Sequence, residues 1–235
     1  MAYETHQNGS WFDETGLVAY YKFQNTGDDS SSSGYNLTTA ATGESYVAGK
    51  FSTAINTSLN TAVISVTGTM GITTATGFTY SVWYRHTTDG EYNTASYILQ
   101  HALPGMTITP SMIWIGTTSS LLLGIFPPTV SSPVSFVTVM TNVWRHIVVA
   151  WGNDVTRVYL DGCQKGVDQS ELTSGVTAGY VSRFNLASYL SDAPRRRWIN
   201  GDFDETLVFS RAWTAGEVAK YYENSKGQFY GQAAF

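Results

Sequence analysis

One segment, residues 144–162, limits the fold of this chain more than any other. A β-branched run at Ile147–Val149 leads to a polar turn at 152–154, and the chain returns through the largely apolar stretch Val155–Leu160. The return ends at Asp161–Gly162, a dipeptide that readily adopts the positive φ angles of a tight turn. The segment therefore predicts a β-hairpin followed at once by another turn.

The composition extends this prediction to the whole chain. The 235 residues suit a single β-sandwich, and only 13% of them are charged, well below the usual quarter. Thr, Ser, Gly and Tyr are abundant, which favours short strands and tight turns. We therefore expect an all-β fold with one domain.

The clearest strand outside the hairpin is Phe78–Arg85, in which Phe78, Tyr80, Val82 and Tyr84 alternate with residues of the opposite face, Trp83 among them. An extension (residues 1–16) precedes the first core strand, Leu17–Phe23. Further strands are expected near residues 46–51, 62–66, 91–103, 112–125, 136–140, 182–187 and 203–209.

One short helix is predicted after the last strand. Thr214–Glu217 has the spacing of a capping box, in which the Thr hydroxyl and the Glu side chain bond each other's backbone N–H. Val218 and Tyr221 or Tyr222 would face the sheet, and Gly227 would supply a left-handed cap. The β domain is expected to span residues 17–225, with a C-terminal tail at 226–235.

Charge and cysteine content exclude several functions. The net charge of −5 argues against a nucleic-acid surface, because phosphate contacts need a basic field. No apolar run reaches membrane-spanning length, so membrane insertion is not expected. The single cysteine, Cys163, excludes an intramolecular disulfide, and the N-terminus has no secretory-signal pattern. We therefore expect synthesis in the cytoplasm without a signal peptide.

Four blocks of sequence together resemble the laminin-G-like, concanavalin A-like lectin/glucanase jelly rolls. They are Leu17–Phe23 with its Asp/Ser/Gly loop, the strand 78–84, the hairpin 144–162, and Asn200–Glu217. The resemblance implies two curved antiparallel sheets with loops at the rim. It also implies a non-catalytic module that binds glycans or proteins, often with one structural calcium ion.

A calcium site would need six to eight oxygen ligands. The resemblance and the Asp-rich first loop together give four candidate metal ligands, with Glu205 instead expected to be a buried, hydrogen-bonded strand residue. The candidates are Asp28, Asp29, Asn36 and Asp204.

Glycan binding would use exposed aromatic rings together with Asn, Asp and Arg on loops. The candidate ligand-binding residues are Tyr92, Asn93, Tyr189, Asp192, Arg195 and Trp198. Trp83, Trp144 and Trp151 are assigned to the core.

Catalysis has weaker support in the sequence. Asp202 and Asp204 alternate onto one face, yet the Glu-x-Asp-x-x-Glu pattern of laminarinase-type glycosidases is absent. The four histidines are scattered without metal-ligand spacing; His146 is expected to hydrogen-bond within the sheet. We therefore expect no enzyme activity and no catalytic residues.

Both tails are rich in aromatic residues, which would either anchor the chain to neighbouring subunits of a homo-oligomeric assembly or dock on the chain itself. These residues are Tyr3, Trp11, Phe12, Phe229, Tyr230 and Phe235.

The function expected from these features is adhesion or recognition of glycans or cell-surface ligands. The chain would be displayed on a phage virion as a fibre, appendage or capsid-decoration protein. Alternatives are a carbohydrate-binding module of a secreted bacterial glycan-degrading system, located outside the cell, and a purely structural decoration protein. A glycoside hydrolase is the weakest alternative.

Overall fold

The structure is a computed structural model that describes residues 11–39, 44–57, 64–67, 70–72, 77–87, 95–102, 111–115, 120–123, 135–138, 142–153, 155–169, 183–187 and 199–227. Its elements are β1 (Leu17–Tyr21), β2 (Thr38–Thr39), β3 (Glu44–Ala48), β4 (Thr53–Thr57), β5 (Ile64–Thr67), β6 (Phe78–His86), β7 (Ala95–Ala102), β8 (Ser111–Ile115), β9 (Ser120–Leu123), β10 (Ser135–Thr138), β11 (Trp144–Gly152), β12 (Val155–Leu160), β13 (Cys163–Gln169), β14 (Arg183–Leu186), β15 (Gly201–Phe209) and α1 (Ala215–Lys226).

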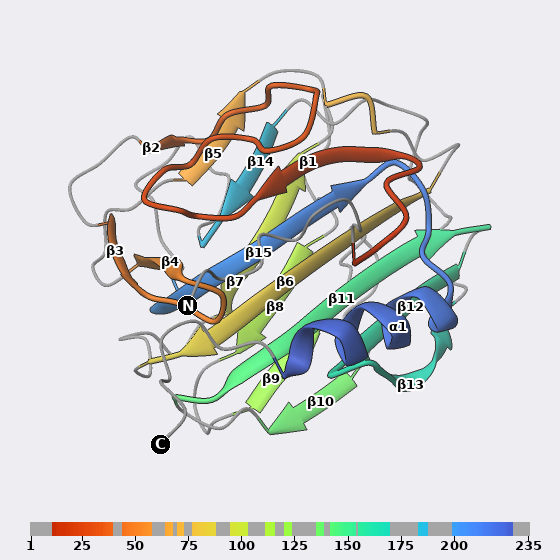
Figure 1. Ribbon diagram of the computed structural model, residues 1–235. Coiled ribbons are helices and arrows are strands. Elements are labelled where there is room, and N and C mark those ends of the chain that lie inside the picture. The colour runs from red at the N-terminus through yellow and green to blue at the C-terminus, as the bar shows by residue number, and fades with distance from the viewer. Residues whose placement is uncertain are drawn as a thin grey trace.

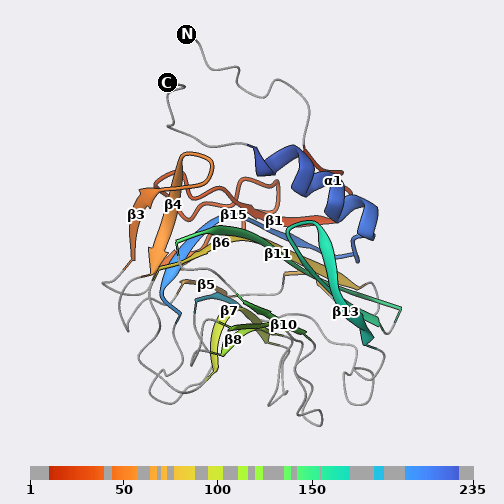
Figure 2. The ribbon, with the colours of Figure 1, turned by 90° about the horizontal axis from the view of Figure 1, so that it is seen from below.

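The strands form a sandwich of antiparallel sheets. The larger sheet has the order β13-β12-β11-β6-β15-β4-β3, with β1 also paired to β15, and the smaller has the order β2-β5-β14-β7-β8; β9 and β10 pair separately. In Figure 2 the larger sheet forms the middle layer, with α1 on one side and the smaller sheet on the other. This arrangement confirms the predicted all-β jelly-roll sandwich with a short C-terminal helix.

The inner core lies between the two sheets. Phe78, Tyr80, Val82 and Tyr84 of β6 all belong to this core, as their alternation predicts, and they pack with residues of the smaller sheet such as Phe184. An apolar face on each sheet must be buried against the other, because exposing it would cost roughly 25 cal/mol per Å².

The predicted hairpin is confirmed by the pairing of β11 with β12, which runs from Ile147 opposite Leu160 to Gly152 opposite Val155. Asp161 and Gly162 both have positive φ, 51° and 77°, as the turn chemistry requires.

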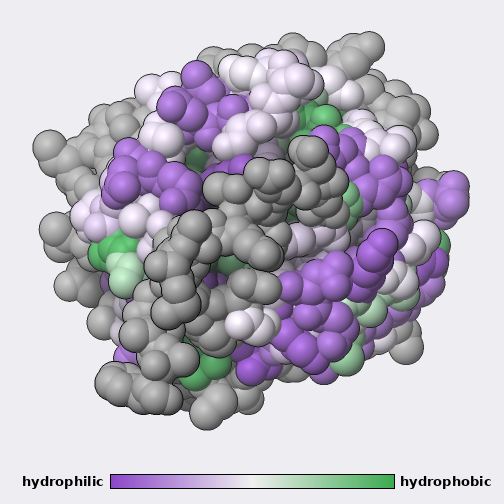
Figure 3. Space-filling model, in the orientation of Figure 1, coloured by the Kyte–Doolittle hydropathy of each residue, from purple (hydrophilic) through white to green (hydrophobic). Residues whose placement is uncertain are grey.

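A second hydrophobic cluster covers the outer face of the larger sheet, beneath α1. It includes Trp83, Phe209 and Trp213 together with Val218 and Tyr221 of the helix. Thr214 and Glu217 form the predicted capping box, with the Thr214 hydroxyl accepting from the Glu217 N–H at 3.2 Å. The solvent-facing side of α1 is hydrophilic (Figure 3).

Gly227 does not have the predicted left-handed conformation, since its φ is −84°. Its N–H instead donates to the Ser225 carbonyl, so the helix closes with a tighter right-handed turn. The described part of the chain includes no helix long and apolar enough to cross a membrane.

The strand predicted at 46–51 is instead the hairpin β3–β4, whose tip spans Gly49–Ser52 and lies over β15. A Cβ on Gly49 would be only 2.7 Å from Asp204 Oδ2 and 2.6 Å from the Thr53 carbonyl carbon. The close approach requires a residue without a side chain, and it turns the chain back where the sequence pattern favours extension.

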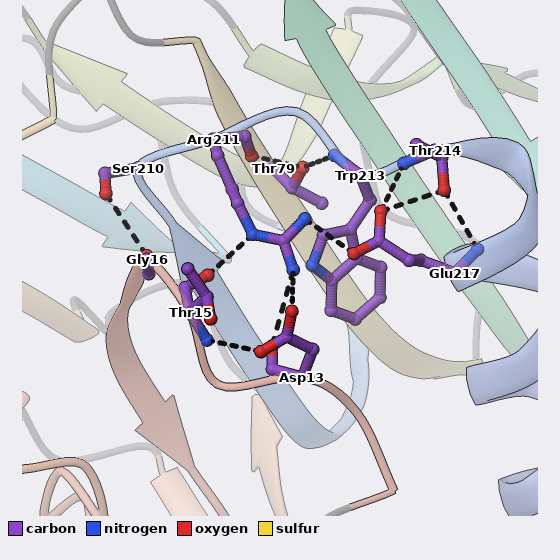
Figure 4. Close-up of polar contacts among 9 residues, drawn as sticks. All are labelled: Asp13, Thr15, Gly16, Thr79, Ser210, Arg211, Trp213, Thr214 and Glu217. Atoms are coloured by element: carbon purple, nitrogen blue, oxygen red, sulfur yellow. Dashed lines mark hydrogen bonds and ion pairs between the residues drawn. The ribbon is translucent and has the colours of Figure 1, made fainter.

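The N-terminal segment is held against the start of α1 by a group of residues that we call the Arg211 clamp: Asp13, Thr15, Arg211 and Glu217 (Figure 4). Arg211 Nε donates to the Thr15 carbonyl at 2.6 Å, and Nη1 lies 2.6 Å from Glu217 Oε1. Nη2 donates to the Asp13 carbonyl at 3.4 Å and lies 3.7 Å from that residue's Oδ2. One guanidinium thus joins the N-terminal segment to the helix cap.

Candidate functional site

Several strand ends lie together at one end of the larger sheet. β6 ends there at His86, directly opposite Gly201 at the start of β15, and Gly201 is also opposite Thr57 at the end of β4. Asn142, just before β11, donates its N–H to the His86 carbonyl at 2.7 Å. Figure 1 shows these strand ends side by side at the left. The ends of β4, β6 and β15 and the residue before β11 therefore lie together at this end of the larger sheet.

One row of residues crosses five strands just inside this end. Trp144 of β11 is opposite Arg85 of β6, which is opposite Asp202 of β15; Asp202 is opposite Asn56 of β4, and Asn56 is opposite Ser45 of β3. Directly paired residues lie on the same face of a sheet, so all five lie on the outer face. With strands about 4.8 Å apart, the row spans roughly 19 Å. We call these five residues the rim row.

The rim row is joined by side-chain contacts around Asp202. Arg85 Nε donates to Asp202 Oδ2 at 2.6 Å, and Asn56 Nδ2 donates to Oδ1 at 2.5 Å. The Arg85 guanidinium carbon lies 4.9 Å from the centroid of the Trp144 ring, a cation–π contact. Arg85 Nη2 donates to the Ala48 carbonyl at 3.3 Å.

These contacts fix the side chains and leave some of their polar atoms available. The Asp202 side chain is only 2% exposed, whereas 28% of the Arg85 side chain is exposed. Asn56 is half-buried and Ser45 is exposed. Within the described ranges, Arg85 Nη1, Asn56 Oδ1 and Ser45 Oγ have no hydrogen-bond partner. The row therefore presents both donors and acceptors from fixed positions.

Trp144 of the rim row differs from its expected place in the core. Trp83 and Trp151 are buried as predicted, whereas Trp144 is only half-buried. Trp144 packs against the outer hydrophobic cluster, and the Arg85 guanidinium lies over its ring. Alternation along β6 and β15 puts Arg85 and Asp202 each on the outer face, but the register that joins them was not visible in the sequence.

The six predicted ligand-binding residues, Tyr92, Asn93, Tyr189, Asp192, Arg195 and Trp198, lie outside the described residues. So do four of the six tail residues, Tyr3, Phe229, Tyr230 and Phe235.

The other two tail residues, Trp11 and Phe12, dock on the chain itself. The Trp11 ring centroid lies 5.0 Å from that of Phe51, and the Phe12 ring lies 5.8 Å from Phe209 and 5.9 Å from Tyr221. For these two residues the structure shows the self-docked alternative.

Asp29, predicted as a metal ligand, organises the first loop through hydrogen bonds. Its Oδ1 accepts from the N–H groups of Tyr20 and Ser31 at 2.9 and 2.8 Å. Its Oδ2 accepts from the Ser31 hydroxyl at 2.8 Å and from the Tyr35 N–H at 2.9 Å. The Asp29 N–H donates to Asn36 Oδ1 at 2.9 Å. The four bonds accepted by Oδ1 and Oδ2 occupy the acceptor positions of the Asp29 carboxylate.

Asp204, another predicted ligand, is fully buried below the β3–β4 hairpin tip. Its Oδ2 accepts from the Phe51 N–H at 3.0 Å, and its Oδ1 from the Glu205 N–H at 2.9 Å. Burial raises the pKa of Asp204 well above its ordinary value, and the neighbouring Glu205 carboxylate raises it further. Asp204 therefore fixes the hairpin tip onto β15.

The predicted ligands do not assemble into a cation site in this part of the protein. Asp28 is exposed on the loop surface, and Asp28, Asp29 and Asp204 are not brought together. Over the described ranges, no group of three or more His, Cys, Asp or Glu residues is placed to hold a metal ion. The Asp29 carboxylate accepts four hydrogen bonds, and Asp204 accepts from the N–H groups of Phe51 and Glu205. Calcium binding stays a prediction.

Two further buried groups, Glu205 and His146, have pKa values shifted by burial. Glu205 is buried and accepts from the Tyr20 hydroxyl, as its alternative assignment predicted; burial raises its pKa to about 7 although this hydrogen bond lowers it. His146 Nε2 is 2.8 Å from Ser81 Oγ on the adjacent strand, which confirms a bond within the sheet. Burial lowers the pKa of His146 to about 3.

Comparison with solved structures shows the same fold in several proteins. Domain 4 of the GH43 extracellular arabinanase AbnA from Geobacillus stearothermophilus, solved in complex with arabinotriose, has a TM-score of 0.68 at 18% identity, covering 88% of this chain and 98% of that domain. The binding domain of Paraclostridial Mosquitocidal Protein 1 gives 0.69 at 16% identity, covering 90% and 52%.

A sialidase from Trypanosoma rangeli gives a TM-score of 0.65 at 12% identity, covering 92% of this chain and 34% of the enzyme. The chain thus spans about half of the mosquitocidal-protein binding domain and a third of the sialidase. These identities establish a shared fold.

No curated protein matches the sequence. A family profile does: Laminin_G_3, described as the concanavalin A-like lectin/glucanases superfamily, matches residues 56–219. This range contains most of both sheets and the start of α1, and the blocks from β6 onward that suggested the resemblance fall within it. The chain therefore belongs to the concanavalin A-like lectin/glucanases superfamily.

Proposed function

We propose that this protein is a non-catalytic glycan-recognition module that binds at the rim row. The observation that carries the proposal is the fixed row of indole, guanidinium, buried carboxylate, amide and hydroxyl groups across five strand ends. Sugar recognition uses a few polar groups held in place beside an aromatic surface, and the rim row supplies them from rigid strands.

The comparisons support a binding role. An arabinanase domain with 18% identity was solved in complex with arabinotriose, and several similar folds are named as toxin binding domains. Because fold alone does not determine function, the rim row carries the proposal and these proteins give it context.

The surroundings of the two aspartates considered for glycoside hydrolysis support a non-catalytic role. Asp202 is held by Arg85 and Asn56, and Asp204 is fully buried beneath the hairpin tip. A glycosidase needs two carboxyl groups facing one substrate-filled space. Both of these carboxyl groups instead bond to the chain itself.

As a biological setting we propose display on a larger assembly, most simply the surface of a phage virion, as a fibre, appendage or capsid decoration. The aromatic tail residues Tyr3, Phe229, Tyr230 and Phe235 motivate this setting, whereas Trp11 and Phe12 dock on the chain itself. Detection of the protein by mass spectrometry only as a processed, secreted bacterial protein would instead favour the carbohydrate-binding module of a secreted system.

The test is a glycan array screened with the whole chain, once with calcium and once with EDTA. The Arg85→Lys variant keeps a cation beside Asp202 but loses the Nη donors and the flat contact with Trp144. We expect at least a tenfold loss of affinity in this variant, with an unchanged melting temperature to within a few degrees.

Arg157→Lys is the matched control, because Arg157 also pairs with an aspartate on the larger sheet, Asp168 at 2.7 Å, away from the rim row. It should bind like the wild type. Selective binding lost in EDTA would establish the proposed calcium ion. A blank array from folded protein would refute glycan recognition and favour a structural decoration role.

A further inference from the structure

We infer that the rim row selects uncharged saccharides and that Asp202 sets this selectivity. The inference rests on the proposed function, since it names the class of glycan that the row accepts. It follows from the charge of the row, from its free polar atoms, and from the burial of Asp202.

The rim row has no net charge. Its only cation, Arg85, has Nε 2.6 Å from Asp202 Oδ2, and the other three members are Ser45, Asn56 and Trp144. An arginine that recognises a carboxylate normally offers an uncompensated, bidentate fork. Here one side of the fork is taken by Asp202 and one Nη2 hydrogen points to the Ala48 carbonyl.

A carboxylated sugar would bring a second carboxylate to a guanidinium that already has one. The two anions would then share one cation in a half-buried site, where like charges repel strongly. Asp202 is 2% exposed, so water screens this repulsion poorly. The protein's net charge of −5 adds a weaker, long-range repulsion.

The free polar atoms match hydroxyl groups better than carboxylates. Arg85 Nη1 can donate, Asn56 Oδ1 can accept, and Ser45 Oγ can do both. A sugar hydroxyl also donates and accepts, so neighbouring hydroxyls can pair with each of these atoms. A carboxylate can only accept, and it would leave the Asn56 oxygen facing another oxygen.

The experiment uses an array that carries neutral oligosaccharides (arabinotriose, maltotriose, lactose) and carboxylated ones (trigalacturonate, 3′-sialyllactose). We expect the wild type to prefer its best neutral ligand at least tenfold over every carboxylated ligand. Asp202→Asn leaves the Arg85 charge uncompensated, so we expect it to raise affinity for a carboxylated ligand at least tenfold.

A second variant tests the same idea without disturbing the buried pair. Ser45→Lys adds a cation at the exposed end of the row, on the edge strand β3, and should also gain binding to carboxylated ligands. Asp168→Asn, which removes the partner of Arg157 outside the row, is the control and should keep the wild-type preference.

The outcomes separate this inference from the proposed function. If folded wild type and variants bind no array member, both fail. If the wild type binds glycans but accepts carboxylated ligands as tightly as neutral ones, the selectivity is wrong while glycan recognition stands. Unchanged preferences in both Asp202→Asn and Ser45→Lys would likewise overturn the role of Asp202.

Discussion

Arg85 and Arg211 lie on the same face of the larger sheet, near opposite ends of β15, and they use the same chemistry differently. Each guanidinium lies over an aromatic ring, Trp144 at 4.9 Å and Phe209 at 5.5 Å. Arg211 uses Nε, Nη1 and Nη2 to bond its own chain (Figure 4), whereas Arg85 keeps Nη1 without a partner among the described residues.

The difference shows how one type of contact can serve either the fold or a ligand. The Arg211 clamp joins segments that are about 200 positions apart in sequence. Loss of the clamp should therefore lower the free energy of unfolding. The rim row joins strand ends that are already paired, so its arginine is not needed to hold them together.

The largest expected effect concerns Glu205, which lies on β15 between the two arginines. Burial raises its pKa from the ordinary 4.5 to about 7, so the folded protein keeps a proton that the unfolded chain has released. Stability from this group is therefore present at low pH and is lost as the pH rises from about 4.5 to about 7. Glu205→Gln removes this loss.

Urea unfolding of both proteins at pH 5 and pH 8 measures the effect. We expect the variant to gain about 2 to 3 kcal/mol relative to the wild type over this range. His146 titrates in the opposite direction, because its pKa of about 3 makes acid destabilising below about pH 6.5, but it contributes equally to both proteins. A difference between the two proteins that does not vary with pH would contradict the assignment.

The next effect separates the Arg211 clamp from the rim row. Arg211→Ala removes the bonds to Thr15 and Asp13 and the ion pair with Glu217. Because the Arg211 side chain is 24% exposed, its ion pairs are partly screened, and we expect the free energy of unfolding to fall by about 2 kcal/mol.

Glycan binding by Arg211→Ala, measured below its unfolding transition, should equal that of the wild type. Stable Arg211→Ala protein with impaired binding would show that the two regions are not independent. The Arg85→Lys variant proposed above is the converse case, with binding lost and stability kept.

The smallest effect tests the helix cap beside the Arg211 clamp. Thr214→Ala removes the hydroxyl that accepts from the Glu217 N–H and should lower the unfolding free energy by about 1 kcal/mol. Thr214→Ser retains the hydroxyl and should restore most of it in thermal or urea unfolding. Equal stability of the Ala and Ser variants would mean that Arg211 and Glu217 alone hold the helix start.

Local sequence patterns were sufficient for much of the fold. The alternation of Phe78–Tyr84, the turn at Asp161–Gly162 and the capping box at Thr214 each depend on neighbouring residues, so their outcome was readable without knowing the partner strands. The β3–β4 hairpin was missed because its turn depends on contact between Gly49 and the distant Asp204.

The candidate site also combines features set by the local sequence with features set by distant contacts. The sequence by itself determined that Arg85 and Asp202 each end or begin an alternating strand, and that an indole stands at position 144. Only the tertiary structure decided that they lie in one row, because the register of strands about 60 to 120 positions apart is set by packing of both sheet faces and by the bulge in β15 after Asp204. The same packing buries Trp83 beneath α1 and leaves Trp144 half-buried at the rim. The sequence could not distinguish these two tryptophans, because their burial depends on which elements cover them.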